Sequence, residues 1–171
     1  MKNAILQTER LYLRKLTLDD AQALLPILGD EEVMRFSISG PMDLDEIKVA
    51  LKDGFMKSYE TYGFGRYAVI RKSDEAFLGF CGPSMQKLDG QGALVEIGYR
   101  FAPGYWGKGY ASEAALAVKE YLFNDLNIPE CISIIEPANT RSIRVAEKLG
   151  MTVLKQAKYY GKIVNVYHIK R

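Results

Sequence analysis

A mixed α/β fold is predicted by the sequence, with helices flanking a sheet whose strands run in both directions. The chain has 171 residues, of which 48% are apolar and 26% charged, values that suit one folded domain. Apolar residues switch along the chain between the alternation of strands and the spacing of amphipathic helices. Neither a repeat nor a linker interrupts these elements, so we expect a single domain over residues 1–171.

The first half of the chain predicts one strand, two helices and then three strands. Leu11 and Leu13 mark the first strand, to which Ile5 is also assigned. A helix then starts at Thr17, and Pro26 should shorten it because proline has no backbone N–H to donate. A longer amphipathic helix is expected over 44–62. Alternating apolar residues predict strands over 64–70, 77–85 and 93–101.

The second half predicts helices alternating with strands, and it ends in a hairpin. A helix follows Ala111, a short apolar strand covers 131–135, and a second helix ends at Gly150. The last two strands are expected over 152–158 and 163–169. The expected order of elements is therefore β, α, α, β, β, β, α, β, α, β, β.

Charge and hydropathy argue against several classes of function. Lys and Arg number 23 against 21 Asp and Glu, and this net charge of +2 speaks against broad binding of nucleic acids or membranes. The longest uncharged stretch, Ala76–Gln86, has eleven residues, fewer than the ~18 of a membrane span. The N-terminus has no signal-peptide core either, so a cytoplasmic location is expected.

Histidine and cysteine are too scarce for a metal site or a histidine-dependent triad. His168 is the one histidine in the sequence, and it lies in the last predicted strand. Cys81 and Cys131 stand in apolar runs that predict buried free thiols in a reducing compartment. No group of Cys and His residues has zinc spacing, so no metal is expected.

A glycine-rich loop, Ala102–Ala111, joins the strand 93–101 to a helix. This order of strand, loop and helix N-terminus is typical of anion sites, since backbone N–H groups converge where the helix dipole is positive. Gly107 and Gly109 would let the backbone approach a phosphate closely, and Lys108 adds a positive charge. A tight turn that merely requires glycine explains the same residues equally well.

Two phosphate-binding folds can be tested against the spacing in this loop. A P-loop would need glycine at 102 and Ser or Thr at 109, where the chain has Ala102 and Gly109. A dinucleotide fingerprint fits better, as Gly107-x-Gly109-x-x-Ser112 with Glu136 after the next strand. It lacks the third glycine, and too little chain follows for further parallel units. A nicotinamide-dinucleotide enzyme stays as an alternative.

Four segments in order resemble the GNAT acetyltransferase superfamily. Trp106-Gly-Lys-Gly-Tyr-Ala111 resembles its acetyl-CoA motif, Q/R-x-x-G-x-G/A. Thr8–Arg14 and Glu96–Tyr99 resemble the opening and central strands of its RimJ/RimL-type branch, the ribosomal-protein N-terminal acetyltransferases. Glu136–Met151 resembles the second cofactor motif. The resemblance implies the GNAT fold, with a mostly antiparallel sheet splayed at the fourth strand, and acetyl-CoA as cosubstrate.

The resemblance also implies which residues hold the cosubstrate. Loop amides would bind the pyrophosphate of coenzyme A, and they belong to Trp106, Gly107, Lys108, Gly109, Tyr110 and Ala111. Backbone groups at the splayed strand end would hold the pantetheine arm and the thioester carbonyl, and they belong to Tyr99, Arg100 and Phe101. Asn139 is similar to an asparagine that contacts this arm, although helix capping explains it equally well.

Two positions depart from the family pattern. Trp106 replaces Gln or Arg, a change that backbone binding of phosphate tolerates. Ala146 stands where many members have the tyrosine that reprotonates the departing thiolate. The acid role then passes to Ser142, one helical turn earlier, or to water, although a bond to its own helix also explains this hydroxyl. The missing tyrosine keeps open a second alternative, a non-catalytic acyl-CoA-binding regulator.

Acetyl transfer to an amine requires a base for its proton and donors for the developing oxyanion. Glu96 is the predicted base, directly or through a water, because it lies on the strand face opposite Val95 and Ile97. An exposed strand glutamate paired with a neighbouring Lys or Arg is the alternative interpretation.

The acceptor is expected to be a primary amine, on a protein N-terminus or a small molecule. An α-amine has a pKa of ~7.7–8.0 against ~10.4 for lysine, so it needs ~3–4 kcal/mol less to become neutral. The resemblance places Phe36, Ser37, Tyr159 and Tyr160 at the acceptor groove, although packing explains the tyrosines as well. The sequence thus predicts an acetyl-CoA-dependent N-acetyltransferase that works by direct attack, with a homodimer left open.

Overall fold

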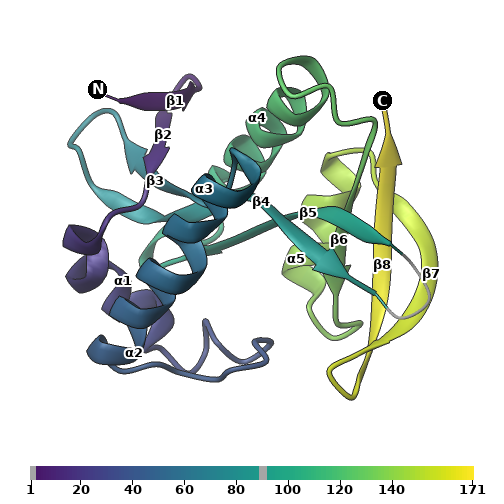
Figure 1. The fold of residues 1–171 in the computed structure, drawn as a ribbon, viewed down its shortest axis with the longest axis horizontal. Helices are drawn as coiled ribbons and strands as arrows, with labels where there is room; N and C mark the ends of the chain where they lie inside the picture. Colours follow the sequence, from purple (N-terminus) through teal and green to yellow (C-terminus); the bar gives the residue numbers. More distant parts are fainter. Residues whose placement is uncertain (1–2, 89–91) are drawn as a thin grey trace.

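The computed structural model describes residues 3–88 and 92–171. Within these residues the strands form one eight-stranded sheet in the order β1-β2-β3-β4-β5-β6-β8-β7. Helices pack on both of its faces (Figure 1). The sheet is antiparallel except between β5 and β6, so the predicted mixed α/β architecture is confirmed.

The N-terminal strand differs from the expectation of a single strand. The chain forms β1 (Ala4–Gln7) and β2 (Leu11–Lys15), paired antiparallel around a turn. Thr8 closes this turn, because its backbone N–H donates to the carbonyl of Leu11 at 2.9 Å. A four-residue strand is too short to show a clear alternation, which explains why the pattern placed Ile5 in one strand with Leu11 and did not separate β1 from β2.

The helices of the first half follow the predicted order. Their bounds are α1 (Ala21–Leu28), α2 (Leu44–Val49) and α3 (Lys57–Tyr62). A π-helical segment, Ala50–Met56, joins α2 to α3, so the helix expected over 44–62 is continuous but widened at its centre. Its start is held by a capping box in which Asp43 accepts from the N–H of Glu46 at 2.9 Å.

The remaining elements lie close to the predicted ranges. The strands are β3 (Tyr67–Arg71), β4 (Phe77–Lys87), β5 (Ala93–Phe101), β6 (Glu130–Ile135), β7 (Thr152–Tyr159) and β8 (Lys162–Lys170). The helices are α4 (Tyr110–Asn124) and α5 (Thr140–Lys148). Short 3₁₀ turns cover Leu18–Asp20 and Pro103–Tyr105.

The two faces of the sheet bury two separate hydrophobic clusters. Along β2, Leu11 and Leu13 belong to the cluster that packs on α4, whereas Tyr12 between them belongs to the cluster under α1 and α2. This alternation is the period of two expected for a strand covered on both sides. The sheet is therefore held from both faces, and its geometry around β5 is well constrained.

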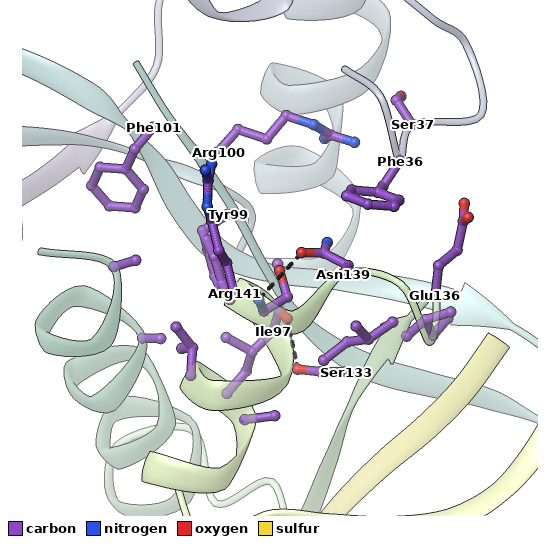
Figure 2. Close-up of a pocket in the computed structure, with 18 of the residues that line it drawn as sticks. Phe36, Ser37, Ile97, Tyr99, Arg100, Phe101, Ser133, Glu136, Asn139 and Arg141 are labelled. Atoms are coloured by element: carbon purple, nitrogen blue, oxygen red, sulfur yellow. Dashed lines mark hydrogen bonds between the residues drawn. The ribbon is translucent and has the colours of Figure 1, made fainter. Parts of the chain in front are cut away.

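The sheet opens between β5 and β6. Strand β5 pairs with β4 from Ala93 to Phe101, but with β6 only through Glu96 and Ile132. Beyond that pair, the hydroxyl of Ser133 donates to the carbonyl of Ile97 at 3.0 Å and ends the contact (Figure 2). The backbone edge of β5 from Gly98 onward is thus left without a strand neighbour on the β6 side, at the splay predicted for this strand.

Candidate active site

A cavity of about 970 Å³ occupies the opening between β5 and β6. It is lined by the end of β5, the glycine loop, the first turns of α4 and α5, the loop 32–39 and the β7–β8 turn. Every residue predicted for the site lines this cavity except Lys108. The structure therefore brings together residues from positions 36 to 160 of the chain (Figure 2).

The glycine loop turns sharply into α4. Gly107 and Gly109 have φ values of +73° and +81°, in the left-handed region that favours glycine, and Gly109 is the N-cap of α4. This conformation brings the loop and the helix N-terminus to the cavity, where their amides meet the positive end of the helix dipole. The loop geometry thus suits an anion.

Arg10 braces this loop from the β1–β2 turn. Its Nη1 donates to the carbonyl of Lys108 at 3.0 Å, and its Nε donates to Oε2 of Glu113 at 2.7 Å. Burial raises the pKa of Glu113, but donors from Thr8 and Arg10 outweigh it and hold that pKa below its ordinary value. The side chain of Lys108 turns back to the carbonyl of Gly104 at 2.9 Å and stays outside the cavity.

The open edge of β5 leaves the backbone N–H and C=O of Tyr99 without a strand neighbour among the described residues. The carbonyl of Ile97 is bonded by Ser133, and the carbonyl of Phe101 accepts from Nε1 of Trp106 at 2.8 Å. Tyr99 lies midway between them, so its N–H and C=O point to the same edge, where β6 is no longer paired. Trp106, the departure from the family pattern, thus closes one end of this edge.

Side chains leave β5 alternately on the two faces of the sheet. Figure 2 shows Tyr99 and Arg100 pointing in opposite directions from the strand. Tyr99 packs with the cluster under α4 and α5, while Glu96 and Arg100 lie on the face of α1 and α2. The strand therefore separates the side chains beside α5 from those beside the loop 32–39.

Glu96 is 9% exposed and lies at the centre of a polar cluster. Its Oε2 accepts from Nη2 of Arg66 at 3.0 Å and from Nε2 of Gln86 at 3.0 Å. The hydroxyl of Ser84 donates to the same oxygen at 3.2 Å. The carboxylate is thus paired with an arginine, as the alternative interpretation described, but it is buried where that interpretation expected an exposed side chain, and it lines the cavity.

The start of α5 faces Tyr99 across the cavity. Asn139 is the N-cap, and its Oδ1 accepts from the N–H of Ser142 at 3.3 Å. Burial raises the pKa of the Tyr99 hydroxyl well above its ordinary range, and the nearby Ser142 side chain opposes this only in part. Tyr99 therefore remains a neutral proton donor at physiological pH. Ala146 is buried one turn further along α5.

The predicted acceptor residues come from two separate segments. Phe36 and Ser37 lie in the loop before α2, while Tyr159 and Tyr160 stack edge to face with ring centroids 4.8 Å apart. The hydroxyl of Tyr159 donates to Oε1 of Gln86 at 2.7 Å. Because Gln86 in turn bonds Glu96, the β7–β8 turn is linked to the polar cluster.

Sequence reasoning missed the partners that surround Glu96. Ser84 faces Glu96 directly in the β4–β5 register, and Gln86 lies two residues further along β4 on the same face. Arg66 arrives from the start of β3, thirty positions earlier in the chain. The alternation of β4 contained a signal for Ser84 and Gln86, since an antiparallel neighbour was predicted there, but Arg66 required the register of three strands.

The titratable groups outside this cluster are less suited to chemistry. Cys81 and Cys131 are buried free thiols, and burial raises the pKa of each to about 12, which keeps them protonated. Among the described residues, no group of three or more His, Cys, Asp or Glu side chains is arranged to hold a metal ion.

No helix in the described ranges has the length and apolarity that crossing a membrane requires.

Comparisons with known proteins agree with this geometry. A family model described as Acetyltransferase (GNAT) domain matches residues 10–152. The chain is 36% identical over 166 residues to the uncharacterized protein YkkB of Bacillus subtilis, covering 96% of this chain and 95% of that protein. It is 32% identical to the uncharacterized N-acetyltransferase p20 of Bacillus licheniformis, with 95% and 92% covered.

A solved structure shows the same fold. The GNAT-family acetyltransferase of Bacillus anthracis superposes with a TM-score of 0.82 at 27% identity, covering 96% of this chain and 97% of that one. GNAT acetyltransferases use acetyl-CoA as the acetyl donor. Since the family model covers most of the chain and the site geometry suits its anionic cosubstrate, the chain belongs to the GNAT superfamily and is an acetyl-CoA-dependent N-acetyltransferase.

Proposed function

We propose that this enzyme acetylates a primary α-amine by direct attack on acetyl-CoA bound across the open edge of β5. The observation that carries the proposal is the open backbone edge at Tyr99, where β6 no longer pairs with β5, in the same cavity as the glycine loop and Glu96. One domain of 171 residues would then hold both substrates, with the acetyl donor on the α5 side and the amine on the α1–α2 side.

The glycine loop would bind the pyrophosphate through the amides from Trp106 to Ala111. Two further cations lie four residues apart on α5, Arg144 and Lys148, and both line the cavity. We assign them to the phosphates, because neither forms an ion pair with a described residue. The backbone of Tyr99 would pair with the pantetheine arm, and Asn139 would contact that arm from α5.

The chemical step moves one acetyl group and one proton. The lone pair of the neutral amine bonds to the thioester carbon, and Glu96, directly or through a water, takes a proton from the nitrogen as this bond forms. The C–S bond then breaks and leaves a thiolate. Ser142, or a water beside it, would return a proton to sulfur. The Tyr99 hydroxyl lies next to Ser142, on the face of the sheet beside α5.

The base assignment is tested by Glu96→Gln, a nearly isosteric change. We expect kcat/KM to fall by ~10²–10⁴-fold, the usual contribution of a positioned base, and the acid limb of its pH profile to disappear. Asp45→Asn, an exposed carboxylate on α2, is the matched control. An unchanged kcat/KM and pH profile in Glu96→Gln would exclude Glu96 as the base.

The acid assignment is tested by Ser142→Ala. We expect a lower kcat, because the thiolate would leave without its proton donor. A change confined to the Kd of acetyl-CoA would make Ser142 a contact of the cosubstrate and pass the acid role to water.

An α-amine suits this site better than a lysine side chain. Neutralising a lysine costs ~3–4 kcal/mol more than neutralising an α-amine, so an α-amine makes the smaller demand on a single carboxylate base. The RimJ/RimL-type segments at 8–14 and 96–99 favour the same choice. Acetylation rates of a short peptide with a free N-terminus and of its N-blocked, lysine-containing counterpart decide between them. Faster acetylation of the blocked peptide would overturn the proposal.

Binding of the acetyl donor is the first measurement to make. Calorimetric titration with acetyl-CoA should show micromolar, salt-sensitive binding, and NADH serves as the control for a dinucleotide site. Preference for NADH would overturn the assignment of the loop to coenzyme A.

A further inference from the structure

Arg100 is an unpaired cation at the acceptor side of the cavity. It lies at the end of β5, on the same face as Glu96, and its guanidinium extends toward the loop that carries Phe36 and Ser37 (Figure 2). Among the described residues, it forms neither an ion pair nor a side-chain hydrogen bond. A half-buried guanidinium with all its donors free is unusual, because these donors fit a carboxylate closely.

The surroundings of Arg100 disfavour its charge. Burial is the main cause that lowers its pKa, to about 10, and the nearby Arg66 adds to the effect. Glu96 is the carboxylate that opposes this shift, but its Oε2 already accepts from Arg66. The enzyme therefore keeps a positive charge in a poor environment, where an anion would stabilise it.

Among the described residues, the carboxylates that line the cavity are already paired with other cations. Three glutamates among the described residues line the cavity, and each forms an ion pair. The nitrogen–oxygen distances are 3.6 Å for Arg141–Glu32, 3.0 Å for Arg66–Glu96 and 2.6 Å for Lys162–Glu136. Arg144 and Lys148 lie on α5, where the proposed phosphates bind. Arg35, which stacks over Phe36, is the other unpaired cation lining the acceptor side in the described residues.

We propose that the acceptor is a primary amine that also carries a carboxylate, and that Arg100 binds this carboxylate. The inference rests on the proposed function, since it concerns the amine substrate of the same site. Glu96 and Arg100 are four residues apart on one strand face, about 13 Å between Cα atoms at the usual rise. Both residues line the same cavity, so we place the amine toward Glu96 and the carboxylate toward Arg100.

This arrangement selects against polycations. A second positive charge on the acceptor would approach Arg100, and it would find no unpaired carboxylate among the described residues of the cavity. Amino acids and peptides with an acidic residue near a free N-terminus share the required chemistry.

The test compares acceptors that differ only in the carboxylate. One pair is an α-amino acid and its carboxamide, and the second is a short peptide with Asp or Asn after a free N-terminal residue. Spermidine provides the polycation. Release of coenzyme A is followed at saturating acetyl-CoA, and kcat/KM is expressed per neutral amine, so that differences in amine pKa cancel. The two pairs separate a small-molecule acceptor from a peptide.

We expect the wild-type enzyme to prefer the carboxylate member of at least one pair by tenfold or more. Arg100→Gln should reduce that ratio to near one, mainly through KM. Arg100→Lys should retain part of it, since lysine keeps the charge but loses the bidentate geometry. Arg35→Gln is the matched control, because it removes an exposed charge from the same cavity and should change the ratio less than about twofold, as screened charges do.

The outcomes separate this inference from the function on which it rests. A wild-type preference for the uncharged amine or for spermidine would overturn the inference and leave the acetyltransferase function intact. A preference for the carboxylate that survives in Arg100→Gln and in Arg100→Lys, both of which still bind acetyl-CoA, would overturn the role of Arg100. Binding of acetyl-CoA without acetylation of any amine would instead refute the proposed function.

Discussion

Arg66 crosses β5 directly over Gly98 to reach Glu96. A Cβ atom on Gly98 would lie 2.5 Å from Nη2 of Arg66 and 2.7 Å from its Cζ, closer than any side chain tolerates. Gly98 thus has no special backbone torsion to maintain, but it leaves the space through which the guanidinium contacts the proposed base. The smallest residue of the strand sets the position of its most polar cluster.

Gly98→Ala is therefore expected to displace Arg66 from Glu96. We predict a fall in kcat/KM of about tenfold or more, because the buried carboxylate would lose the guanidinium that positions it. Gly104→Ala is the control, since a Cβ there meets no atom within 4 Å. Steady-state kinetics on both variants measure the effect, and equal rates would show that Arg66 does not position the base.

Gly109→Val should weaken acetyl-CoA binding by forcing a branched residue into a left-handed conformation. Such a conformation costs about 1–2 kcal/mol for a non-glycine residue, so the loop should shift and its amides lose their alignment. Gly63→Val carries the same strain at φ +77°, at the end of α3 and away from the cavity. Calorimetry should show a raised Kd for acetyl-CoA only in Gly109→Val. A similar Kd in both variants would show that the loop does not bind the phosphates.

Glu113 should contribute stability that depends on pH. Its pKa is depressed in the folded state, so the contribution is present above its unfolded pKa of ~4.3 and is lost as pH falls through the folded pKa. Glu113→Gln should therefore be about 1–2 kcal/mol less stable than wild type near neutral pH, with the difference shrinking below about pH 4. Urea unfolding at several pH values measures this.

Glu120→Gln is the control for Glu113, because Glu120 is an exposed residue of the same helix that pairs with Lys119 at 3.3 Å. Its effect should stay below about 0.5 kcal/mol. A pH-independent difference between Glu113→Gln and wild type would mean that packing, and not the charge, stabilises this position.

Asn139→Ala should lose both a helix cap and a contact to the acetyl donor. The cap accounts for about 1 kcal/mol of stability. Asp43→Ala removes a comparable cap from α2, outside the cavity, and should cost a similar amount without changing the Kd of acetyl-CoA. If the Kd stays the same in Asn139→Ala as well, capping alone explains the asparagine.

The sequence predicted most of the fold because local patterns determine most of it. Alternation found β5 and placed Glu96 opposite Ile97, and glycine spacing found the loop before α4. Those patterns carry no information on register, so the contact of Arg66 with Glu96 was not predictable. Trp106 was interpreted as a tolerated departure, yet its indole N–H bonds the carbonyl of Phe101, a role that depends on how the loop folds back.

The role proposed for Arg100 could not be predicted from the sequence either. Its position in the strand indicated a backbone contact, and its side chain carried no recognisable motif. The folded structure shows that the described glutamates lining the cavity are each paired with another cation, and that Arg100 is therefore left without a carboxylate partner among them. Whether a charge is compensated is a property of the folded cavity, and no short segment of sequence contains it.

The incomplete pairing of β5 with β6 has a consequence for how this sheet behaves in time. In the proposed complex, the pantetheine arm fills the position of a missing strand beside Tyr99, so the ligand completes the sheet. Each catalytic cycle then assembles this short piece of secondary structure when acetyl-CoA enters and dismantles it when coenzyme A leaves. The amide hydrogen of Tyr99 should accordingly exchange with solvent quickly in the free enzyme and slowly in the complex.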